Sequence, residues 1–189
     1  MLQRLTLALF VLLVFSAGTA SAQADPFCTI GVYADADGTL STFQPVQGEP
    51  FDVYVVMFSE SLVNAVALQL FVPGLGNEVV QISEDFGPGG GGLNIPTSGG
   101  FNIGLGECAV GFGGLPIRIA RFGFLFPFET IGTRTINLGP NPDEDPEAPV
   151  FSDCQGRIYP CNVAQGLFLE GPVDTQSESF GAVKSLYAN

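Results

Sequence analysis

Histidine and tryptophan are missing from this chain, and lysine and arginine together number only six among its 189 residues. Without histidine, Ser-His-Asp and Cys-His catalytic arrangements and histidine-based metal sites are excluded. The formal net charge of −13 opposes binding to nucleic acid or anionic lipid, because six cations cannot form a basic patch. Without tryptophan, the flat aromatic surfaces of a sugar-binding site would have to come from phenylalanine or from the four tyrosines, Tyr33, Tyr54, Tyr159 and Tyr187.

Other routes to catalysis find little support in the sequence. Lys184 is the only lysine, and its place near the C-terminus is a poor one for the desolvation that a nucleophilic lysine needs. A pair of carboxylates could hydrolyse glycosides, but no spacing singles out two of the glutamates near predicted strand ends, which are Glu60, Glu78, Glu107 and Glu129. We therefore predict no catalytic residue, no cofactor and no enzyme, with a carboxylate-pair glycoside hydrolase as an alternative.

The first 24 residues match a secretory signal peptide. Arg4 precedes an apolar run over residues 5–15, and small residues end in the Ala-Ser-Ala sequence of residues 20–22. The run is too short to span a bilayer easily, so we predict cleavage of this signal helix after Ala22 or Ala24. The mature chain is then expected to be secreted, periplasmic or extracellular, with no membrane contact.

Four cysteines follow the signal: Cys28, Cys108, Cys154 and Cys161. An even number in an exported chain favours disulfides, and a zinc site would need closer paired spacing and usually histidine. Sequence allows three connectivities. We prefer Cys108 with Cys154, which closes a loop worth about 4 kcal/mol in the chain-entropy model, and this choice leaves Cys28 with Cys161.

The strongest structural pattern lies in residues 51–72, where two apolar runs flank the polar break Ser59-Glu60-Ser61. Both runs alternate as half-buried strands do, and the linkers are too short and too rich in glycine and proline for the helices of a parallel α/β sheet. We predict an all-β fold, an antiparallel two-sheet β-sandwich over residues 25–174. Its core faces are predicted to carry Val53, Val55, Val66, Leu68, Leu70, Ile82, Ile117 and Ile119.

The segment 115–128 changes phase. Ile117 and Ile119 share one face of a strand, whereas Phe122, Phe124 and Phe126 fall on the opposite register. A bulge at Gly123 would correct the phase and bury the phenylalanines. Alternatively, both faces of the strand are covered. If neither holds, the row is exposed as a partner surface.

Three loops could bind ligands. Asp35 and Asp37 are weak calcium candidates, but the Asp-Gly turn that ends at Gly38 explains them without a metal. The glycine-rich residues 87–100 lack the helix and the lysine of a phosphate loop, so we interpret them as a mobile surface loop. The acidic, proline-bounded residues 141–149 are interpreted as a solvated loop.

The tail, residues 175–189, is predicted to form a short helix. Thr175 and Glu178 have the spacing of a capping box. One apolar stripe of this helix, a candidate partner surface, would contain Phe180, Val183, Leu186 and Tyr187. So short a helix is marginal alone, so it should dock on this sandwich or in the groove of a partner.

The order of the blocks IGVYAD, FDVYVV, AVALQLFVP, GLGEC, FSDCQGRIYPC and SFGAVKSLY resembles a family of uncharacterised exported bacterial proteins. The layout of GEPFDVYVV and AVALQLFVPGLGNEVVQIS is similar to the opening strands of cohesin and carbohydrate-binding β-sandwiches. These resemblances imply an immunoglobulin-like or cohesin-like fold and transfer no activity to a residue. We predict an extracellular structural or protein-interaction module, with a carbohydrate-binding module as the alternative. The partner, protein or glycan, and the oligomeric state stay open.

Overall fold

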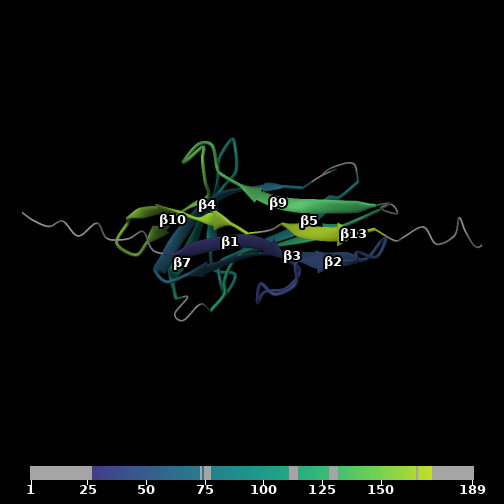
Figure 1. Ribbon diagram of the computed structural model, residues 1–189, viewed down its shortest axis with the longest axis horizontal. Coiled ribbons are helices and arrows are strands. Elements are labelled where there is room, and N and C mark those ends of the chain that lie inside the picture. Colours follow the sequence, from purple (N-terminus) through teal and green to yellow (C-terminus); the bar gives the residue numbers. More distant parts are fainter. Residues whose placement is uncertain are drawn as a thin grey trace, which may run out of the picture.

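The computed structural model describes residues 27–72, 74, 78–110, 115–127, 132–164 and 166–171, and these residues form two stacked β-sheets (Figure 1). All regular elements in these ranges are strands. Within them, no helix is long and apolar enough to cross a membrane. The predicted signal helix and the predicted C-terminal helix, with its stripe, lie outside the described residues.

The first sheet has five strands. Their order is β12 (Asn162–Val163), β1 (Cys28–Tyr33), β3 (Pro50–Ser59), β8 (Ile117–Leu125) and β5 (Val80–Phe86). All neighbours are antiparallel except β1 and β12.

The second sheet has eight strands. One path runs through β11 (Ile158–Pro160), β10 (Val150–Asp153), β4 (Leu62–Phe71), β9 (Thr133–Gly139), β13 (Leu167–Glu170) and β2 (Thr42–Phe43). In addition, β4 pairs with β7 (Phe101–Val110), which pairs with β6 (Leu93–Pro96). β10 lies towards one end of the molecule, and β13 and β2 lie towards the other (Figure 1). Since β2 and β13 are parallel, the predicted antiparallel pairing holds except at two short pairs.

The predicted core is confirmed at six of its eight positions. Val53, Val55, Leu68 and Ile119 are fully buried, and Val66 and Ile117 nearly so, in one cluster that joins the two sheets. Leu70 is only partly buried at the edge of this cluster, towards the end of β4. Ile82 is a wrong prediction, because its side chain is 49% exposed. The register between β5 and β8 shifts between Gln81 and Ser83, and the bulged Ile82 lies on an edge strand.

The phenylalanine row of β8 is buried, as predicted, but the bulge is not at Gly123. The β3–β8 register shifts where Val55 and Val56 face Ala120 and Arg118, so Ile119 is the extra residue. The phase is therefore corrected before the phenylalanines begin, and Phe122, Phe124 and Phe126 face the core. Gly123 has another role, since a Cβ there would overlap the hydroxyl of Ser83 on β5.

Both predicted disulfides are present. Cys28 of β1 is joined to Cys161, directly before β12, with a Cα–Cα distance of 4.8 Å. Cys108 of β7 is joined to Cys154, directly after β10, with a Cα–Cα distance of 6.0 Å. The second bridge ties together two strands that flank β4 on either side.

Candidate functional site

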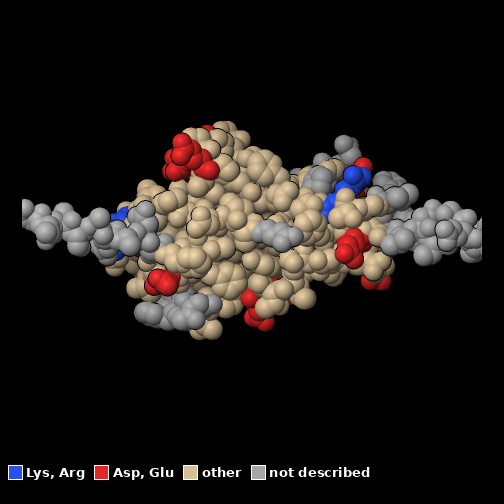
Figure 2. All heavy atoms as spheres, viewed as in Figure 1, with Lys and Arg blue, Asp and Glu red and all other residues tan. Residues whose placement is uncertain are grey.

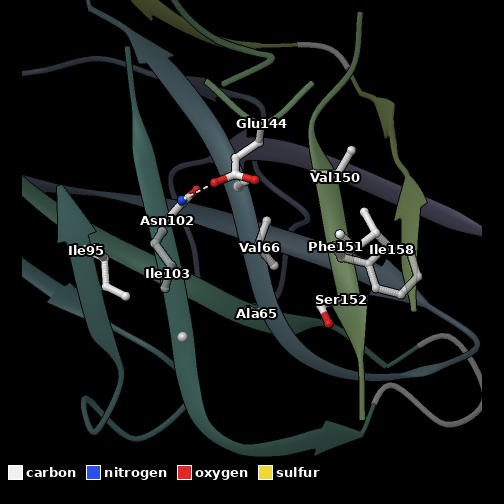
Figure 3. Close-up of a pocket in the computed structure, with 12 residues that line it drawn as sticks. Ala65, Val66, Ile95, Asn102, Ile103, Glu144, Val150, Phe151, Ser152 and Ile158 are labelled. Carbon is white, nitrogen blue, oxygen red and sulfur yellow. Dashed lines mark hydrogen bonds between the residues drawn. The ribbon is translucent and has the colours of Figure 1, made fainter. Parts of the chain in front are cut away.

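An apolar groove of about 220 Å³ crosses the outer face of the second sheet near β10 (Figure 3). Ala65 and Ala67 of β4 and Gly104 of β7 contribute to its floor. The register of β4 and β7 turns Val66, Leu68 and Ile103 inwards into the core, and this alternation leaves the small residues outside. The sequence therefore places a low surface between more prominent side chains.

The sides of the groove are two exposed isoleucines. Ile95 of β6 is 61% exposed and Ile158 of β11 is 65% exposed. The strands run in the order β6, β7, β4, β10 and β11, so four interstrand steps separate the two sides, or about 19 Å. An α-helix with its side chains is about 10–12 Å wide and would fit between them. Since β7, β4 and β10 each have a partner strand on both edges, an occupant of the groove would bind through side-chain contacts.

One end of the groove is acidic. Glu144, in the loop between β9 and β10, lines the groove, and the Nδ2 group of Asn102 donates a hydrogen bond of 2.7 Å to its Oε1 (Figure 3). The same loop contains Asp143, Asp145 and Glu147. Figure 2 shows acidic side chains gathered where this loop, green in Figure 1, projects from the molecule. We call residues 143–147 the acidic lip.

Asn141 holds the acidic lip in place. Its side chain is 1% exposed, and its Nδ2 group donates to the Thr97 hydroxyl (3.2 Å) and to Asn102 Oδ1 (3.1 Å). Its Oδ1 atom accepts a hydrogen bond from the Asp143 amide at 3.1 Å. Thr97 and Asn102 belong to the β6–β7 hairpin, which carries Ile95. These bonds therefore fix the acidic lip to the Ile95 side of the groove.

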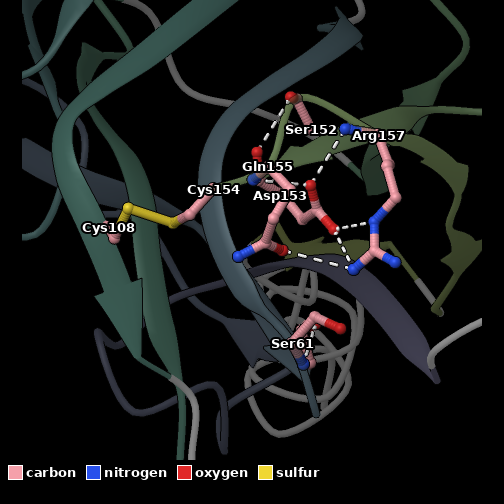
Figure 4. Close-up of polar contacts among 8 residues, drawn as sticks. Ser61, Cys108, Ser152, Asp153, Cys154, Gln155 and Arg157 are labelled. Carbon is pink, nitrogen blue, oxygen red and sulfur yellow. Dashed lines mark hydrogen bonds and ion pairs between the residues drawn. A yellow bond between two sulfur atoms is a disulfide. The ribbon is translucent and has the colours of Figure 1, made fainter.

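The other side of the groove is held by the turn after β10 (Figure 4). The carboxylate of Asp153 accepts hydrogen bonds from the amides of Gln155 and Arg157, both at 2.9 Å, and from Arg157 Nε at 2.7 Å. Burial raises the pKa of Asp153, but these hydrogen bonds outweigh it and hold the pKa below its usual value. Arg157 also lies over the ring of Tyr159. The turn thus positions β11, and with it Ile158.

The calcium candidates lie in a turn with internal hydrogen bonds. Asp35 Oδ1 accepts from the amides of Thr39 (2.9 Å) and Leu40 (2.8 Å), and Gly38 has a φ of 68°. Partial burial raises the pKa of Asp35. The hydrogen bonds from Thr39 and Leu40 lower the pKa by more than burial raises it, so it lies below its usual value. Within the described ranges, no three acidic or cysteine side chains are grouped as a metal site, at Asp37 or elsewhere.

The remaining candidates are scattered. Tyr33 and Tyr54 are cross-strand neighbours on the first sheet, whereas Tyr159 lies on the second sheet and Tyr187 lies outside the described residues. Glu78 forms an ion pair with Arg134 at 3.1 Å, and Glu129 lies outside the described residues.

The groove itself was not predicted. Its Ile95 lies in the glycine-rich segment interpreted as a mobile loop, yet residues 93–96 pair with residues 101–104 as β6. That interpretation is wrong for this part of the segment, because a four-residue strand among glycines is too short for a periodic signal. Nothing in the sequence indicated that Ile95 and Ile158 would be exposed on opposite sides of one groove.

No protein-family model and no curated protein sequence matches the chain. Solved structures do match. A non-cellulosomal cohesin of Archaeoglobus fulgidus has a TM-score of 0.51 at 14% identity, over 82% of this chain and 97% of that one. A cohesin of Acetivibrio cellulolyticus scaffoldin B, in complex with a Cel5 dockerin, has a TM-score of 0.50 at 14% identity, over 76% and 98%. A type I cohesin of Clostridium thermocellum, in a cohesin–dockerin complex, has a TM-score of 0.52 at 8% identity, over 78% and 96%. At such identities the similarity establishes a cohesin-like β-sandwich fold.

Proposed function

We propose that this chain is a secreted, non-catalytic docking module that binds a protein partner in the groove between Ile95 and Ile158. The observation that carries the proposal is the groove itself. Two isoleucines more than 60% exposed stand on either side of a floor of alanine and glycine. Contiguous apolar surface of this kind is typical of protein interaction sites, because water leaves it when a partner binds.

The lining favours a protein over a glycan as the occupant. Sugar hydroxyls need free hydrogen-bonding groups, but the lining is mainly apolar, and its Asn102 and Ser152 already donate to Glu144 and to the Asp153 carbonyl. The acidic lip adds a charge requirement at one end, where a partner with lysine or arginine would be attracted and correctly oriented.

Two further observations support an extracellular docking role. Two disulfides are typical of proteins that fold in an oxidising compartment, which agrees with the predicted signal peptide. Two of the similar cohesin structures contain a bound dockerin, so the same fold presents a docking surface in those proteins.

Photocrosslinking from the groove would test the proposal. A photoreactive amino acid replaces Ile158, and a matched variant carries it in place of Ile82, which is also exposed but lies on the first sheet. In secreted protein from the native host, we expect Ile158 to crosslink to a separate protein, and Ile82 not to do so. The purified partner should then bind wild type at least tenfold more tightly than Ala65→Arg, which fills the floor. Crosslinks that are absent from Ile158, or equal from both positions, would refute the proposal.

A further inference from the structure

A row of four cross-strand neighbours lies on the outer face of the first sheet, the face opposite to the groove. Tyr33 of β1 pairs with Tyr54 of β3, Tyr54 pairs with Arg121 of β8, and Arg121 pairs with Asp85 of β5. All four side chains are partly exposed. The row crosses three interstrand steps, or about 14 Å, which is enough for a short linear chain of sugar rings.

Tyr33 lies flat because of a glycine. A Cβ on Gly31, two residues earlier on the same face, would come within 2.9 Å of the Tyr33 ring, so the ring extends over the bare backbone of Gly31. Phe58 contacts the ring edge-on, with centroids 6.4 Å apart and planes at 84°. This arrangement fixes an aromatic face against the sheet, on the strand next to Tyr54. Aromatic faces carry partial negative charge and attract the C–H groups of a sugar ring.

Arg121 lies between two carboxylates and donates a hydrogen bond to neither. Its NH1 group is 3.7 Å from Asp52 Oδ2 and its Nε group is 3.9 Å from Asp85 Oδ2, both too long for hydrogen bonds. No described residue accepts a hydrogen bond from Arg121, and its side chain is 39% exposed. Arg118 is different, since its Nε and NH2 groups both donate to the Gly87 carbonyl. Arg121 therefore has terminal donors free for an acceptor that arrives from solvent.

We propose that this row, centred on Tyr54 and Arg121, binds an uncharged oligosaccharide. Within the row Arg121 balances Asp85, and the neighbouring Arg118 balances Asp52, so the row and its ion-pair partners carry no net charge on a strongly acidic protein. Free N–H donors beside carboxylate acceptors suit hydroxyl groups, which both donate and accept. A uronic acid would be repelled by the carboxylates on both sides of Arg121. Since the row and the groove lie on opposite faces, the chain can hold a glycan and a protein together, and each proposal can fail without the other.

The test is an NMR titration of the isotope-labelled secreted chain with soluble cellohexaose, xylohexaose, mannohexaose, maltohexaose and an oligogalacturonate. We expect at least one neutral oligosaccharide to shift amide signals of β1, β3 and β8 around the row. Tyr54→Ala and Arg121→Gln should each weaken that affinity at least tenfold. Tyr159→Ala, which removes a partly exposed tyrosine of the second sheet, should leave it unchanged. Amide spectra of each variant verify the fold, and Arg121→Gln tests the row even if Tyr54→Ala does not fold.

Three results would overturn the proposal. No neutral oligosaccharide shifts the row at millimolar concentration, or both Tyr54→Ala and Arg121→Gln bind as wild type does, or the oligogalacturonate binds more tightly than every neutral chain.

Discussion

Asp153 is 1% exposed, and its carboxylate accepts hydrogen bonds from both the backbone amide (2.9 Å) and the guanidinium (2.7 Å) of Arg157. Cys154, directly after Asp153, is bonded to Cys108 of β7 by a disulfide (Figure 4), and Ile158 directly follows Arg157 in the sequence. Asp153 thus holds the turn that carries Ile158, and the disulfide at the next residue ties this turn to β7, which forms part of the groove floor.

Asp153 makes this turn sensitive to acid. Its pKa lies below the ordinary value of 3.8, so the stability it contributes is fully present above 3.8 and is lost as pH falls through the lower folded value. We expect wild type to melt at a higher temperature than Asp153→Asn at neutral pH, and the difference to shrink below about pH 3.8. Circular dichroism melts across this range measure it. A difference that stays constant with pH would show that the charge of Asp153 does not hold the turn.

Truncation of a core residue should destabilise the protein far more than truncation of a bulged residue. Leu68 is fully buried between the sheets, so Leu68→Ala should cost about 2–5 kcal/mol of unfolding free energy. Ile82, in a strand of the same sequence pattern, is exposed at a bulge, so Ile82→Ala should change stability by less than about 0.5 kcal/mol. Urea unfolding measures both. Similar losses at the two positions would contradict the register described for β5.

The contrast between Leu68 and Ile82 also shows what a sequence can predict. Alternation in β3 and β4 reports which face is buried, because a side chain changes face at every residue. A bulge inserts one residue without any change in composition, so the bulge at Ile82 could not be predicted. In β8 the phase change indicated a bulge, but not its position at Ile119. Cysteine number and loop length led to the correct disulfides, since few pairings compete.

The groove escaped prediction for another reason. Ile95 and Ile158 are brought to opposite sides of Ala65 and Gly104 only by the strand order β6, β7, β4, β10, β11. Periodicity assigns faces but not neighbours, and the strands that carry these isoleucines have four and three residues. Asn141 gave no signal either, because an asparagine in a polar loop looks the same whether it is buried or solvated.

The two disulfides should differ in their contribution to stability. Cys28 and Cys161 are separated by 133 residues and Cys108 and Cys154 by 46. In the chain-entropy model the first bridge stabilises by about 5 kcal/mol and the second by about 4 kcal/mol. The double variant Cys28→Ala/Cys161→Ala should therefore unfold at lower urea concentration than Cys108→Ala/Cys154→Ala. The reverse order would mean that the bridge beside Asp153 stabilises the native turn in addition to restricting the unfolded chain.

The acidic lip should control how fast a partner reaches the groove. Glu144→Lys reverses a charge at the groove end. Association with the purified partner that crosslinking identifies should therefore slow severalfold at low salt. The effect should fade as salt is raised, because screening shortens the range of the interaction to about 8 Å at physiological ionic strength.

Asn141→Ala tests the positioning of the same charge. It leaves the Asp143 amide and Asn102 Oδ1 without their Asn141 partner and should cost about 1–3 kcal/mol of stability. It should also slow association while every charge is retained. Stopped-flow kinetics at several salt concentrations compares both with Glu84→Lys, a charge reversal on the exposed edge strand β5. If Glu144→Lys and Glu84→Lys slow association equally, the net charge of the protein, and not the lip, attracts the partner.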